Sequence, residues 1–154
     1  MPVRPKSSRR KGRERAFQVL YSLNFTPQPT IGLLERTFRS LLGGDPQNCA
    51  EADAFAWELI SGVGRTLETL DSGISRFSHH WKLKRIARIE LTILRLALFE
   101  MLYRPDIPNK VAINEAIELS KVFGDDKSRS FVNGILDAAV QAIENGSLGL
   151  DQEP

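Results

Sequence analysis

Residues 83–103 read LKRIARIELTILRLALFEMLY, and this stretch decides the fold. At 100° per residue, its apolar side chains cover most of the circumference of a helix, a pattern typical of a central and mostly buried helix. The one polar stripe of this helix consists of Arg85, Arg88, Thr92 and Arg95. The stretch therefore predicts a helix at the centre of the fold.

The rest of the chain also shows helical periodicity, with proline and glycine stops between the segments. Residues 1–7 read as a flexible basic arm, because Pro2 and Pro5 should block an early helix. We expect an all-α fold of about seven helices and no sheet. The expected segments are about 8–25, 30–42, 50–70, 71–80, 83–103, 110–122 and 126–145.

Composition narrows the function classes. Hydrophobic residues make up 42% of the 154 residues, enough for a packed interior. The single cysteine, Cys49, cannot form an internal disulfide, which favours a reduced, cytoplasmic setting. No apolar run reaches the roughly 18 residues of a membrane span, and no apolar core follows the basic N-terminus as in a secretory signal.

The basic charge is concentrated at one end. Residues 1–13 hold six basic residues and no acid, which leaves 15 of the 21 basic residues against all 19 acidic ones. The remainder therefore has a formal net charge of −4. Arg9, Arg10, Lys11 and Arg13 should project beyond the apolar face, which begins at Ala16. Such an arm suits phosphate contacts, and the alternative is a solubilising tail.

Two side chains look misplaced for a simple core. Tyr21 lies on the polar face of the first helix, where it indicates either a contact surface or cover by another helix. Glu90 lies in the apolar arc of residues 83–103, where an unpaired carboxylate would cost several kcal/mol, roughly. Glu90 is therefore expected either to pair internally or to face a partner across a groove.

Enzymatic patterns are weak. His79 and His80 are adjacent and do not share a helical face, and no further residues complete a metal site. The sequence has no glycine-rich phosphate loop, nucleophile elbow or cofactor fingerprint. Trp57 and Trp81 are interpreted as packing residues. We therefore expect no catalytic residues, no metal and no cofactor.

Four segments in order resemble the NusB transcription antitermination factor family, and together they cover nearly the whole chain. The segments are RRKGRERA with LYS (9–16 and 20–22), RIARIE with ILRLALFE (85–90 and 93–100), DIP with KVAINEAIEL and FG (106–108, 110–119 and 123–124), and Ser128 with FVNGILD (131–137).

The resemblance implies a single all-helical domain over residues 8–147, built from two packed sub-bundles at about 8–80 and 81–147, and a loose tail at 148–154. It implies binding to single-stranded boxA RNA, together with the ribosomal protein that doubles as NusE, within the RNA polymerase antitermination complex. Its role would be in ribosomal RNA transcription and maturation. The RNA contacts of the family carry over to Arg9, Arg10, Lys11 and Arg13, and the partner contacts to Tyr21 and Glu90.

One position departs from the family pattern. Family members often carry an acid directly before the serine that precedes Phe-Val-Asn-Gly, whereas this chain has Lys127. We retain Lys127 as a candidate RNA contact. Phe131 is a second candidate by carry-over, with core packing as its alternative. Gly134 is interpreted as a point of close helix approach, because helical spacing continues through it.

Two other functions compete with RNA-dependent antitermination. The first is a helical protein-interaction adaptor whose arm only aids solubility. The second is the NusB-like domain of a ribosomal RNA methyltransferase, a reading that fails if the chain ending at Pro154 is a complete gene product. The resemblance leaves both a monomer and a homodimer open.

Overall fold

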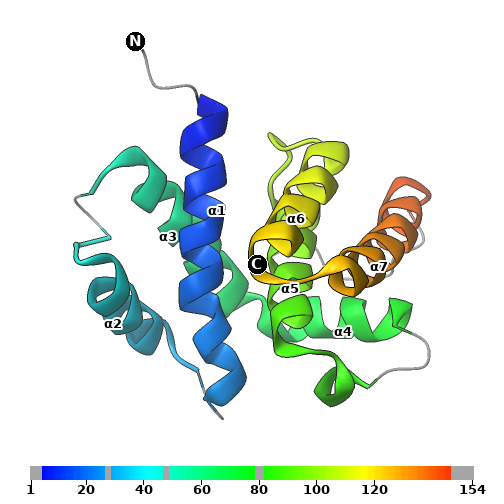
Figure 1. Ribbon diagram of the computed structural model, residues 1–154, viewed down its shortest axis with the longest axis horizontal. Helices are drawn as coiled ribbons and strands as arrows, with labels where there is room; N and C mark the ends of the chain where they lie inside the picture. Colours follow the sequence, from blue (N-terminus) through cyan, green and yellow to red (C-terminus); the bar gives the residue numbers. More distant parts are fainter. Residues whose placement is uncertain (1–4, 27–28, 47–48, 79–81, 147–154) are drawn as a thin grey trace. The chain divides into compact units, whose positions relative to one another are not determined.

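The computed structural model describes residues 5–26, 29–46, 49–78 and 82–146 (Figure 1). Residues 1–4 of the expected arm, the expected loose tail at 148–154, and the sequence HHW at 79–81 lie outside the described residues. Our expectations for those positions stay predictions.

Seven α-helices and two short 3-10 turns make up the described residues, with no strand among them. The predicted all-α fold is therefore confirmed. In chain order the elements are α1 (Pro5–Tyr21), a 3-10 turn (Ser22–Phe25), α2 (Ile31–Leu42), α3 (Glu51–Arg65), α4 (Leu67–Phe77), a 3-10 turn (Leu83–Arg85), α5 (Arg88–Tyr103), α6 (Asn109–Phe123) and α7 (Asp126–Glu144).

The chain divides into two compact units, Met1–Arg65 and Thr66–Pro154. In the first unit, α1 packs along α3, and α2 packs against both. Phe38 of α2 is fully buried, and its ring meets Trp57 of α3 edge to face, with 5.6 Å between ring centroids. Trp57 is half-buried, so its predicted role in packing is confirmed.

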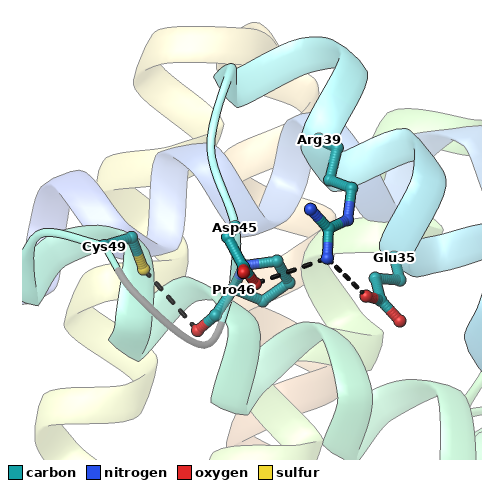
Figure 2. A network of polar contacts seen from close by, with 5 residues as sticks. All are labelled: Glu35, Arg39, Asp45, Pro46 and Cys49. Carbon is teal, nitrogen blue, oxygen red and sulfur yellow. Dashed lines mark hydrogen bonds and ion pairs between the residues drawn. The ribbon is translucent and has the colours of Figure 1, made fainter.

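The connection between α2 and α3 is closed by polar contacts (Figure 2). Gly43 ends α2 with a φ of 72°, a conformation that favours glycine. Arg39 Nη2 donates to Glu35 Oε1 at 3.0 Å and to Asp45 Oδ1 at 3.4 Å, and the Cys49 thiol lies 3.7 Å from the carbonyl oxygen of Pro46. Burial, together with nearby acids, raises the pKa of Cys49, so this thiol is a weak nucleophile at neutral pH.

In the second unit, α5 is the central helix, as predicted. It contacts α4, α6 and α7, and every residue from 91 to 102 is buried. The polar stripe is buried with it: the Thr92 hydroxyl donates to the carbonyl of Arg88 at 2.7 Å. Arg95 binds Asp71 of α4 through two parallel hydrogen bonds, Nε–Oδ1 at 2.8 Å and Nη2–Oδ2 at 3.0 Å. This fork-to-fork pair fixes α4 on α5.

Several boundaries differ from the predicted ones. Helix α1 begins at Pro5, because proline at a first helical position sacrifices no hydrogen bond; residues 5–7 are thus helical, contrary to the expected flexible arm. The predicted helix over 50–70 breaks at Thr66, and α4 packs on α5 and α7. The boundary between units therefore falls at 65/66, earlier than the expected boundary near residue 80. Helix α5 begins at Arg88, after a short 3-10 turn and extended backbone at Ile86.

Candidate nucleic-acid and partner-binding surfaces

The basic end of α1 lies directly against α3, and a glycine makes this contact possible. A Cβ added to Gly12 would lie 2.7 Å from the carbonyl oxygen of Ala52 and 2.9 Å from the ring of Phe55. Any side chain at position 12 would therefore force the two helices apart. One ion pair, Arg15 with Asp53, joins the same two helices.

Two of the arm arginines lie over one aromatic ring. The guanidinium carbon of Arg9 is 5.0 Å from the centroid of the Phe55 ring, and that of Arg13 is 5.3 Å away. Both distances are within the range of a cation–π interaction. Arg9 also lines a small pocket of about 190 Å³ with Ser8, Glu51, Ala54, Phe55 and Glu58. The side chain of Phe55 thus orders part of the basic segment.

The four predicted RNA-contact residues of α1 therefore differ in exposure. Arg10 and Lys11 are exposed and Arg9 is half-buried, whereas Arg13 is only 3% exposed. The expectation that all four project beyond the core is wrong for Arg13, because the inner face of α1 begins before Ala16, with Gly12 and Arg13 already packed on α3. Sequence reasoning missed Phe55. The one available signal was a glycine inside an arginine-rich helix.

Tyr21 belongs to an aromatic row on α1 and the turn that follows. Its ring stacks on buried Phe17 at 5.9 Å between centroids and meets Phe25 edge to face at 5.4 Å. Tyr21 is half-buried, and Phe25 is 56% exposed. An exposed aromatic ring beside a half-exposed tyrosine is typical of a protein contact surface. Sequence reasoning identified Tyr21 and missed Phe25.

Glu90 lies in the first turn of α5, half-buried beside the N-terminus of α7. Burial raises the pKa of Glu90, a hydrogen bond from the Ser128 side chain lowers it, and the nearby Asp125 charge raises it further. Asp125 itself caps α7 and accepts a hydrogen bond from the Ser128 amide at 2.9 Å. Within the described part of the chain no ion pair reaches Glu90. Its internal partner is a hydroxyl, and the arginine that an internal ion pair would need is not found there.

The remaining predicted residues lie on α7. Lys127 is exposed and Phe131 is half-buried. Helix α7 continues through Asn133 and Gly134, as predicted. Gly134 is exposed, and a Cβ added there would meet no atom within 4 Å. The interpretation of Gly134 as a point of close helix approach is therefore wrong, because no other helix comes near it.

Two further searches cover the described residues only. They contain no group of three or more His, Cys, Asp or Glu side chains arranged to hold a metal ion. None of their helices is long and apolar enough to cross a membrane.

The sequence matches a family model, that of the NusB family, over residues 10–141. The chain belongs to the NusB family. A curated NusB relative, the transcription antitermination protein NusB of Oleidesulfovibrio alaskensis, is 55% identical over 143 residues, which are 92% of this chain and 93% of the relative.

Solved NusB structures share the fold. A crystal form of T. maritima NusB is 33% identical, with a TM-score of 0.74 over 92% of this chain and 93% of that one. A chain from the crystal structure of the antitermination factors NusB and NusE in complex with double-stranded RNA is 25% identical, with a TM-score of 0.73 over 88% of this chain and 98% of that one. The NusB family resemblance and the all-α fold expected from the sequence are both confirmed.

Proposed function

We propose that this NusB-family protein is a non-catalytic transcription antitermination factor. In this proposal it binds boxA-type single-stranded RNA jointly with a NusE-type ribosomal protein and acts in ribosomal RNA transcription and maturation. It would work in the cytoplasm, as part of an RNA polymerase antitermination complex. The observation that carries the proposal is the ordered basic segment of α1, where exposed cations adjoin arginines packed on Phe55.

This basic segment supports RNA binding better than a solubilising tail does. A solubilising tail needs only charge, whereas here Arg9 is fixed over an aromatic ring and Gly12 brings α1 against α3. Fixed cations lose less conformational entropy when they meet phosphate. Arg10 and Lys11 are exposed on this ordered scaffold and are the proposed phosphate contacts, with Arg9 beside them. Burial of Arg13 argues for a supporting role beneath them.

The partner surface is proposed to include Tyr21 and Glu90. Tyr21 offers an apolar ring with a polar tip, next to the exposed ring of Phe25. Glu90 is a carboxylate without an internal cation among the described residues, next to the acidic Asp125. A basic side chain of the NusE-type protein would relieve this local excess of negative charge. The solved complex of NusB, NusE and RNA shows that a protein of this fold takes both kinds of ligand.

The test is a salt series. Binding of labelled single-stranded boxA-type RNA is measured for the wild type, Arg10→Ala and Lys11→Ala, with the NusE-type protein present. For each lost phosphate contact, the slope of log K against log salt should fall by roughly 0.7. Lys121→Ala serves as the control, because Lys121 is an exposed cation far along the chain on α6. Slopes that are unchanged in both α1 variants would reduce this segment to a solubilising feature and favour the adaptor function.

A further inference from the structure

Gly134 lies in the middle of α7, where a glycine has a cost that the fold does not explain. A glycine inside an exposed helix is less stable than alanine, because it loses more backbone freedom on folding. Its φ is not positive, so its backbone conformation is open to any residue. No neighbouring atom would touch an added Cβ. Gly12 and Gly124 differ, because a Cβ at either position would collide with the protein itself.

The face around Gly134 carries side chains suited to nucleic acid. Lys127, Phe131 and Gly134 are spaced i, i+4 and i+7, so they lie along one side of α7. Lys127 is an exposed cation and Phe131 presents part of an aromatic ring. A cation next to an aromatic side chain is the pairing that binds the backbone and bases of single-stranded RNA.

A shallow groove adjoins this face. It has a volume of about 310 Å³ and is lined by Ile117 of α6 and by Asp126, Arg129, Ser130 and Asn133 of α7. Arg129 forms an ion pair with Asp126, so its charge is balanced within the groove. In the part of the chain that the structure describes, the Asn133 carboxamide has no hydrogen-bond partner. The groove therefore offers a neutral donor and acceptor pair, which suits the edge of a base better than a phosphate.

We propose that single-stranded RNA crosses this face of α7, with its sugar–phosphate backbone against Gly134 and one base in the groove beside Asn133. The missing side chain at Gly134 leaves the room that the ribose and phosphate occupy, which is a common use of glycine where a backbone meets a ligand. This inference rests on the proposed RNA binding and adds a second contact region to the one on α1. Lys127 supplies the cation for this region.

The test uses two glycine variants of the full chain. Gly134→Ala should raise the Tm, by about 2–4 °C for a chain of this size, because the helix gains and nothing collides. The same variant should bind boxA-type RNA about tenfold more weakly, with the NusE-type protein present. Gly32→Ala is the matched control: Gly32 is an exposed helical glycine on α2, and an added Cβ meets only the Thr30 hydroxyl oxygen, at 3.9 Å. Gly32→Ala should leave RNA affinity unchanged.

A second variant tests the base contact. A set of RNAs, each with one abasic position, should contain one position at which the wild type loses affinity and Asn133→Ala does not. That pattern would identify the base that the carboxamide reads. If no abasic position is relieved in this way, Asn133 does not read a base.

The outcomes separate this inference from the proposed function. RNA affinity of Gly134→Ala equal to that of the wild type overturns the inference while leaving the proposed function intact. Loss of affinity for the NusE-type protein with unchanged RNA affinity also overturns it and assigns this face to a protein. A lowered Tm contradicts the open space around Gly134. If the wild type binds no RNA at all, the proposed function and this inference both fail.

Discussion

Replacing Arg13 by alanine separates a supporting arginine from a ligand-binding one. Arg13 is 3% exposed and its guanidinium lies 5.3 Å from the Phe55 ring centroid. A desolvated cation–π contact contributes about 1–2 kcal/mol, and the loss of buried methylene groups adds about 0.8 kcal/mol each. Because desolvation of the charge offsets part of this, we expect Arg13→Ala to lower the free energy of unfolding by about 2 kcal/mol. The corresponding fall in Tm is about 4–8 °C.

Lys11→Ala is the matched comparison, because Lys11 is exposed on the same turn of α1. Its free energy of unfolding should change by no more than about 0.5 kcal/mol. Calorimetry gives the two Tm values, and RNA titrations below the Tm of both variants give their salt slopes. Lys11→Ala should lower the slope and Arg13→Ala should not. Unchanged stability of Arg13→Ala, together with a slope as low as that of Lys11→Ala, would refute the supporting role of Arg13.

Three further variants test other parts of the structure. Because burial and Asp125 raise the pKa of Glu90, the charged carboxylate costs stability once the pH exceeds this pKa, and the cost disappears below the usual glutamate range. Glu90→Gln should therefore unfold at the same or a higher Tm at pH 7, with the gain lost in acid, while its affinity for the NusE-type protein falls about tenfold; a large loss of Tm at pH 7 would point to an internal ion pair instead. Gly12→Ala should lower both the Tm and RNA affinity, because it separates α1 from α3, and an unchanged Tm would contradict the close approach. Asp71→Ala should cost about 3–5 kcal/mol of unfolding free energy, since it leaves buried Arg95 without its carboxylate, and urea unfolding measures this loss.

The sequence predicted the parts of the fold that depend on local pattern. Residues 83–103 are apolar on nearly all sides, and the helix within them is buried, as that pattern requires. Ala16, Leu20 and Leu23 were expected on the inner face of the first helix, and all three are buried. Such residues could be identified because helical periodicity is a property of neighbouring positions.

Contacts between distant positions could not be predicted in the same way. The packing of Arg13 on Phe55 depends on the register between α1 and α3, which no local pattern reports. The break at Thr66 lies inside a continuous helical pattern and follows from the packing of α4 on α5 and α7. The hydrogen bond between Glu90 and Ser128 joins α5 to α7, so neither segment alone reveals it.

The central claim is that this chain and a NusE-type ribosomal protein bind single-stranded boxA-type RNA together. The most direct measurement is a fluorescence-anisotropy titration of labelled boxA-type RNA with the full chain, with and without the NusE-type protein, at several salt concentrations. We predict binding that weakens steadily with salt and a clearly lower Kd when the NusE-type protein is present. The absence of RNA binding at low salt in both titrations, or a Kd that the NusE-type protein does not change, would contradict the claim.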